Sequence, residues 1–164
     1  MKRVRHLVKI SLLAMLATVG FDLFLHSGVL AGLYSSPSPF LLPAEEAFRL
    51  IPVGYLAFLL LIVLLIWLMP RLGILGWRPG LTFGLKLGAL IWGSLTLGLL
   101  SISTASPILM VAWFLGQTAE LGIAGMVLGS GLASTRLRPL LVRVAVFFAV
   151  MVALAIVFQN IGNF

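Results

Sequence analysis

The chain is a series of long apolar runs separated by short polar or proline-containing segments. A helix needs roughly 20 apolar residues to cross a hydrocarbon core about 30 Å thick, and five of the runs reach that length. The pattern therefore predicts one all-α integral membrane domain, residues 1–164, with five transmembrane helices. Their expected ranges are 7–34, 48–69, 80–101, 107–133 and 140–158.

Proline and charge mark the expected helix boundaries. Pro37 and Pro39 should end the first helix, because proline lacks an amide donor and restricts the residue before it. Glu45 and Glu46 after Pro43 are typical of a helix start, where carboxylates face the positive end of the helix dipole. The basic N-terminus and the first apolar run resemble a signal peptide, but the run is too long for one, so we expect it to be retained.

Composition excludes several classes of protein. Hydrophobic residues make up 62% of the chain and charged residues 9%, whereas soluble domains carry about 25% charged residues. There is no cysteine, which excludes disulfides and thiolate chemistry. The sequence has no Walker, G-x-S-x-G or H-E-x-x-H motif. We therefore expect a protein that is not an enzyme and that requires no cofactor.

The net charge of +7 predicts an orientation in the membrane. Ten of the eleven basic residues fall in or beside segments on one side of the predicted bundle, and only Arg49 falls on the other. Basic loops face the cytoplasm, so the N-terminus should be cytoplasmic and the C-terminus outside. Because the charge has this explanation, we expect contact with membrane lipid and no nucleic-acid partner.

Small residues at four-residue spacing predict where the helices pack, because they let helix backbones approach closely. Such ridges occur on the first, third and fourth helices. Their members are Gly28 and Gly32, then Gly80, Gly84 and Gly88, then Gly125 and Gly129. The fifth helix, 140–158, has no such ridge and is almost wholly apolar. We therefore expect it to face lipid or to contact another membrane subunit.

Ionisable residues within membrane helices are costly and are default candidates for a functional site. Asp22 and Glu120 fall near the middle of the first and fourth helices. His26 lies four residues after Asp22 on the same helix face, and Gln117 shares a face with Glu120. We expect these four side chains to form one intramembrane polar site. Glu45, Glu46 and Arg49 should form its outer rim.

Two kinds of role are open to this site. Two carboxylates in a low-dielectric environment favour either a shared proton or a cation between them, as in a proton relay or cation site. Alternatively, Asp22 pairs with Arg49 or His26, and Glu120 with a backbone or hydroxyl partner, and these pairs only fix helix register. A metal site is not expected, because no H-x-x-x-H or E-x-x-H ligand pair lies on one helix.

Several short patterns in this chain resemble those of a group of small bacterial polytopic inner-membrane proteins with no assigned activity. They are F-D-x-x-x-H-S-G from Phe21 to Gly28, E-E-x-x-R from Glu45 to Arg49, G-L-x-F-G-L from Gly80 to Leu85, and W-F-L-G-x-x-x-E from Trp113 to Glu120. The resemblance implies a bacterial inner membrane location and one shared site for Asp22, His26 and Glu120. The fifth helix is an addition to the four-helix body of that group.

Three functions agree with these observations. The first is an accessory or scaffold subunit of a larger membrane complex, contacted through the fifth helix. The second is a small proton or cation channel or transporter that uses Asp22, His26 and Glu120. The third is a pigment- or lipid-binding membrane subunit, with the glycine-lined faces and Trp113 as contacts. The sequence places the first function ahead of the other two.

Overall fold

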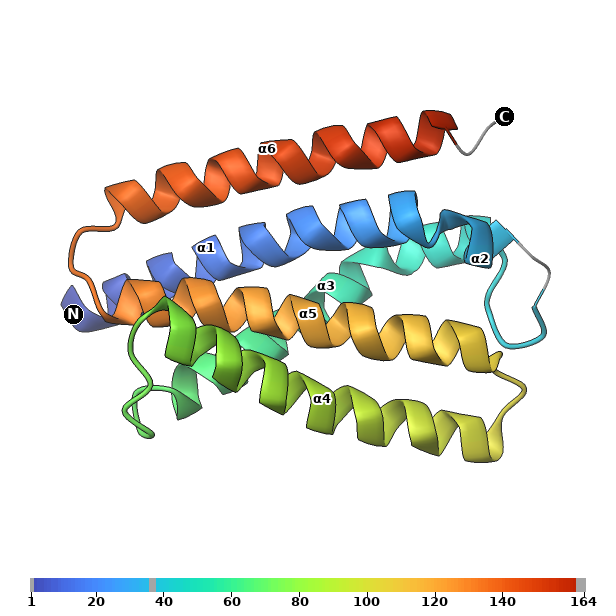
Figure 1. Cartoon of the computed structure of the whole chain (residues 1–164), viewed down its shortest axis with the longest axis horizontal. Coiled ribbons are helices and arrows are strands. Elements are labelled where there is room, and N and C mark those ends of the chain that lie inside the picture. Colours follow the sequence, from blue (N-terminus) through green and yellow to red (C-terminus); the bar gives the residue numbers. More distant parts are fainter. Residues whose placement is uncertain (1, 36–37, 162–164) are drawn as a thin grey trace.

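The computed structural model describes residues 2–35 and 38–161, and all regular elements in these ranges are helices. Figure 1 shows their arrangement. The elements are α1 (Lys2–Asp22), the π-helix η1 (Leu23–Val29), α2 (Ala31–Ser35), α3 (Ala44–Leu68), α4 (Trp77–Ile102), α5 (Pro107–Leu132) and α6 (Arg138–Ile161).

Five helical segments in the described part of the chain are long and apolar enough to cross a membrane. The predicted all-α bundle of five membrane-spanning helices is confirmed, with ends that differ by a few residues. For example, α4 begins at Trp77 and α6 at Arg138. Positions 36 and 37 of the expected break after the first helix lie outside the described residues. The orientation in the membrane stays a prediction.

The first membrane segment differs from the regular helix expected over 7–34. It changes from α-helix to π-helix after Asp22, and the amide of Leu30 donates to the carbonyl of Leu25, five residues earlier, at 2.8 Å. The Ser27 hydroxyl donates to the carbonyl of Leu23 at 2.5 Å. Apolar residues surround the whole segment, so hydrophobic periodicity carries no signal for this change. Single π-helical turns are frequent at functional sites.

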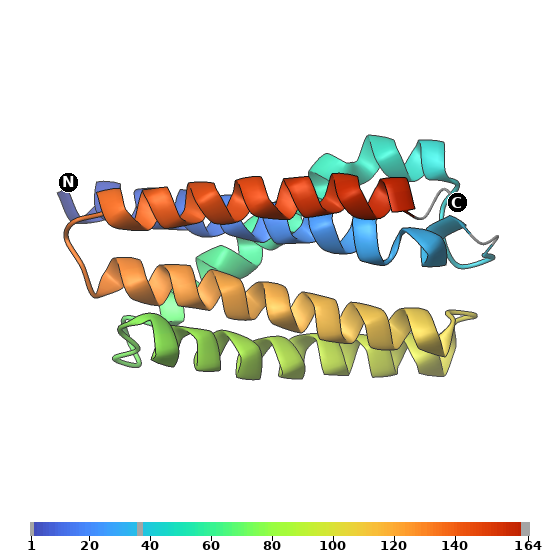
Figure 2. The ribbon, with the colours of Figure 1, turned by 45° about the horizontal axis from the view of Figure 1, so that its top comes forward.

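The helices form two layers that a third element crosses. Helices α1 and α6 lie side by side in one layer, α4 and α5 lie in the other, and α3 runs obliquely across them (Figures 1 and 2). Helix α5 is central, because it contacts α1, α3, α4 and α6 and its span is the most buried of the five.

Helices α4 and α5 touch through their backbones. A Cβ atom added to Gly84 would overlap the carbonyl of Leu121, and one added to Gly125 would overlap the carbonyl of Gly80. A Cβ at Gly129 would overlap the carbonyl of Gly76, whose amide donates to the Gly129 carbonyl at 2.9 Å. The contact is looser at Gly88, where an added Cβ would lie 3.0 Å from the Cα atom of Thr118. Only glycine permits this approach, which maximises van der Waals contact.

The two glycines singled out on the first segment differ in their surroundings. Gly28 faces α6, where an added Cβ would lie 3.3 Å from Phe158 Cβ, whereas no atom lies within 4 Å of such a position at Gly32. Gly20, which the four-residue spacing did not single out, faces Phe148 of α6. Helix α6 is therefore an outer helix whose inner face packs on α1 and η1.

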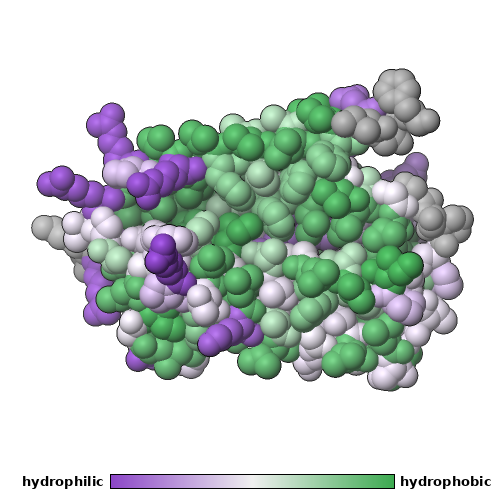
Figure 3. Space-filling model, in the orientation of Figure 1, coloured by the Kyte–Doolittle hydropathy of each residue, from purple (hydrophilic) through white to green (hydrophobic). Residues whose placement is uncertain are grey.

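The surface agrees with immersion in a membrane. In Figure 3 hydrophobic residues cover the middle of the visible face, and strongly hydrophilic residues gather at the end where α1 begins. Large apolar side chains such as Leu60 and Ile102 are mostly exposed. A bilayer would cover such side chains, since lipid is as apolar as they are.

We predict that Gly84→Ala destabilises the bundle. The new Cβ would overlap the α5 backbone, which cannot yield as a flexible side chain can, so the free energy of unfolding should fall by about 1–3 kcal/mol. Gly98→Ala on the same helix is the matched control, because nothing lies within 4 Å of its added Cβ. Thermal unfolding in detergent measures both variants. Equal stability of the two would contradict backbone contact between α4 and α5.

Candidate functional site

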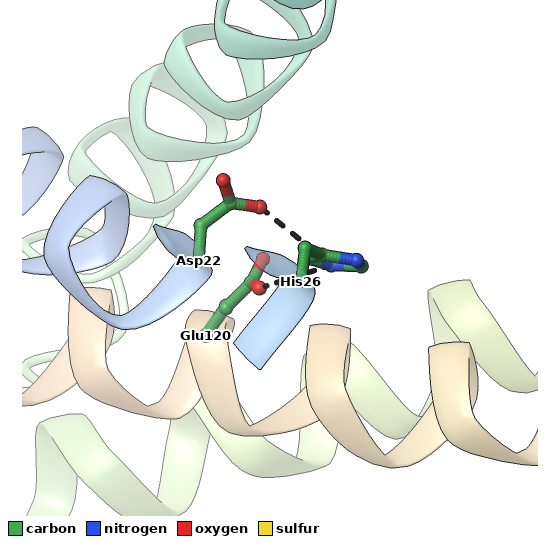
Figure 4. A group of neighbouring side chains, drawn as sticks. All are labelled: Asp22, His26 and Glu120. Atoms are coloured by element: carbon green, nitrogen blue, oxygen red, sulfur yellow. Dashed lines mark ion pairs between the residues drawn. The ribbon is translucent and has the colours of Figure 1, made fainter. Parts of the chain in front are cut away.

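Three titratable side chains from two separate segments meet inside the bundle. Asp22 ends α1, His26 lies in η1, and Glu120 comes from the middle of α5. His26 Nε2 lies 3.6 Å from Asp22 Oδ1 and 3.8 Å from Glu120 Oε1 (Figure 4). One potential ligand atom from each residue lies within 4.8 Å of the other two. The structure thus brings together the three residues that the sequence assigned to one polar site.

Glu120 is the most deeply buried member of this cluster. Its side chain is 0% exposed, compared with 15% for Asp22 and 24% for His26. Neither carboxylate oxygen of Glu120 has a hydrogen-bond partner among the described residues. Buried polar groups are normally satisfied, and an unpartnered one costs free energy. Within the described residues, the carboxyl group of Glu120 therefore has only its ion pair with His26, whose 3.8 Å distance is too long for a hydrogen bond.

The His26 ring is held by hydrogen bonds on both of its nitrogen atoms. Nδ1 lies 2.5 Å from the hydroxyl of Tyr34 in α2, and that hydroxyl accepts a hydrogen bond from the Trp113 indole at 2.7 Å. The Gln117 amide nitrogen lies 3.2 Å from His26 Nε2. These contacts fix the ring so that Nε2 faces the two carboxylates. Gln117 joins the site, as the sequence predicted that it would.

Asp22 also contacts the helix that crosses the bundle. The Tyr55 hydroxyl of α3 interacts with the Asp22 carboxyl group. Tyr34 and Tyr55 are the only two tyrosines of the chain, and both lie beside the cluster. Sequence reasoning missed both. The sequence contained one signal for them, because tyrosine is rare in this chain and a tyrosine hydroxyl in an apolar helix needs a polar partner.

A cavity of about 750 Å³ borders the cluster. Its polar and aromatic lining includes Asp22, His26, Ser27, Tyr34, Tyr55, Trp92, Trp113 and Gln117. Apolar residues of α3, among them Ile51 and Phe58, form much of the remaining wall, together with Leu41 and Leu42 of the segment before α3. Clefts with apolar walls and a few converging polar groups are the usual form of ligand sites.

The expected outer rim lies apart from the cluster. Glu45, Glu46 and Arg49 are exposed on the first turns of α3 and do not line the cavity. Among the described residues, the ion pairs of Asp22 and Glu120 join both of them to His26, and no arginine or lysine takes part. The suggested pairing of Asp22 with Arg49 is therefore absent from the described structure.

No protein-family model, no curated protein and no solved structure matches the chain.

We predict that Glu120→Met stabilises the protein. Methionine fills a similar volume and removes a buried carboxyl group that has no hydrogen bond to the described residues, so the free energy of unfolding should rise by about 1–3 kcal/mol. Thermal unfolding in detergent, without added metal ions, measures the change. Thr96→Val is the control, because the buried Thr96 hydroxyl donates a hydrogen bond to the Trp92 carbonyl, so that removing it should not stabilise the protein. A less stable Glu120→Met protein would mean that Glu120 has a structural partner.

A second prediction concerns access to the cavity. The chain contains no native cysteine, so a thiol reagent can react only with a cysteine that is introduced by substitution. Ala57 lines the cavity, whereas the adjacent Leu56 is 56% exposed and does not. If water fills the cavity, a charged thiol reagent should modify Ala57→Cys much faster than Leu56→Cys, which lipid shields in membranes. Equal rates would show that the cavity is not an aqueous route.

Proposed function

We propose that this integral membrane protein binds a cation at Asp22, His26 and Glu120 and conducts or transports it. The observation that carries the proposal is the wholly buried Glu120 carboxyl group, which has no hydrogen-bond partner in the described part of the chain and faces two further titratable side chains. A group of this kind is costly in a membrane unless a ligand or counter-charge compensates it. A cation supplies that compensation.

The electrostatics of the cluster favour a positive ligand. Two carboxylates lie together where the effective dielectric constant is low, so their mutual interaction is strong. No arginine or lysine side chain pairs with either carboxylate in the described part of the chain. A bound cation would neutralise this negative charge, whereas a bound anion would increase the electrostatic cost.

The cavity supports a path to the site. Its lining includes Asp22, His26 and Tyr55 as well as Leu41 and Leu42, which come just before the start of α3. A cation entering along this path would reach the cluster without crossing the close contact between α4 and α5. The cavity and the site differ, because most of the cavity wall is apolar and, of the two carboxylates, only Asp22 lines it, whereas Glu120 is wholly buried.

The other expected functions have less support from the geometry. An accessory subunit would present a surface for its partner, but the exposed apolar face of α6 suits lipid equally well. A pigment- or lipid-binding role would use the same cavity without needing the carboxylates. We retain the proposals that the protein is not an enzyme and that it resides in a bacterial inner membrane.

Flux through reconstituted liposomes tests the proposal. The purified full chain should carry protons, Na⁺, K⁺ or a divalent cation faster than protein-free vesicles. Asp22→Asn and Glu120→Gln should reduce that flux to background, because each removes a charge from the site. Glu46→Gln is the matched control, because Glu46 is an exposed carboxylate outside the cavity.

Size-exclusion profiles should be the same for all variants, so that loss of flux reports function and not misfolding. Flux that persists unchanged in both site variants would overturn the proposal. Absence of any cation flux in the wild-type protein would overturn it as well.

A further inference from the structure

We infer that the cation bound at this site is a divalent transition metal ion, such as Zn²⁺, held by Asp22, His26 and Glu120. The inference rests on the proposed cation site and specifies its ligand. The sequence alone gave no expectation of a metal, since the ligands come from two helices that lie far apart along the chain. Only Asp22 and His26 share one segment.

The spacing of the ligand atoms fits a metal ion better than a set of direct hydrogen bonds. Separations of 3.6 Å and 3.8 Å from His26 Nε2 to the two carboxylates exceed the 2.7–3.2 Å range of N–H···O bonds. Zinc lies about 2.0–2.2 Å from nitrogen and oxygen ligands, so neighbouring tetrahedral ligands are about 3.4 Å apart. Small side-chain shifts would complete that geometry, with the metal ion between the three groups.

The hydrogen bonds of the His26 ring orient it as a metal ligand. Metal-binding histidines usually bond through their second ring nitrogen to a fixed partner, which sets the tautomer and the ring orientation. Here Tyr34 engages Nδ1 and is itself held by Trp113, so Nε2 remains directed at the carboxylates. A structural histidine that only paired with Asp22 would not need this supporting pair.

Gln117 can complete the ligand set. Its amide nitrogen now lies 3.2 Å from His26 Nε2, and its Oε1 has no hydrogen-bond partner among the described residues. Rotation of the amide by 180° exchanges the two atoms, since they differ little in size, and turns an oxygen donor toward the site. With Asp22 and Glu120, that gives three oxygen ligands and one imidazole.

The ligand types select the class of cation. Imidazole suits Zn²⁺, Cu²⁺, Fe²⁺ and Ni²⁺, whereas Mg²⁺ and Ca²⁺ prefer sites made only of oxygen atoms. Two carboxylates balance the charge of a divalent ion, so the occupied site would be neutral inside the membrane. A monovalent cation would leave one negative charge uncompensated.

Metal titration of the full chain tests the inference. The protein is purified in detergent without a histidine tag, treated with a chelator, and titrated with Zn²⁺ by calorimetry and with Co²⁺ by visible absorption. We expect one ion per chain, visible Co²⁺ bands of a low-coordinate N/O site, and no displacement by excess Mg²⁺ or Ca²⁺. Binding should disappear in His26→Asn and Glu120→Gln.

Two further variants separate a metal site from a loss of folding. Tyr34→Phe keeps all the ligands but releases His26 Nδ1, so Zn²⁺ affinity should fall about 10–100-fold. His6→Asn is the matched control, because this histidine bonds to the Gly131 carbonyl outside the cluster, and it should bind Zn²⁺ like the wild type.

Failure of this inference is distinct from failure of the proposed function. If the wild type binds neither Zn²⁺ nor Co²⁺, or if folded His26→Asn binds them equally well, the metal assignment is wrong. Flux of Na⁺, K⁺ or protons that depends on Asp22 and Glu120 would then still support a cation site. Metal binding without any flux would support the metal site and overturn transport.

Discussion

Close backbone contact between α4 and α5 is the constraint on which the rest of the structure depends. Gly80 and Gly84 on one helix and Gly125 and Gly129 on the other leave no room for a Cβ atom. Without a hydrophobic driving force between helices in lipid, such contact is a principal source of association. It makes α5 the central helix, and the opposite side of α5 then packs against the first membrane segment.

The position of Glu120 follows from that packing. Because α5 is covered on several sides, a carboxyl group in its middle is removed completely from the surface. The π-helical turn of η1 lies beside it and carries His26, while the Tyr34 and Trp113 side chains hold the imidazole in place. The cluster is therefore assembled from a rigid helix pair and a locally irregular segment, and α3 closes its third side through Tyr55.

Much of the fold was predictable, because membrane helices must satisfy their backbone hydrogen bonds internally and be apolar over a fixed length. That constraint determines five helices almost directly from five apolar runs. The site was predictable only in part. Burial cost marked Asp22 and Glu120, and the scarcity of tyrosine was a signal for Tyr55, but nothing in the apolar sequence marked the π-helical turn or the cavity beside the cluster.

The sequence by itself determined the class of protein, the number of membrane helices and the identity of the costly polar residues, since each depends on composition or on local spacing. The tertiary structure alone decided that α5 is central, that Arg49 stays away from Asp22, and that a cavity reaches the cluster. These properties depend on how helices far apart along the chain rotate against one another. Helices exposed to lipid are apolar on nearly every face, so their periodicity contains little information about that rotation.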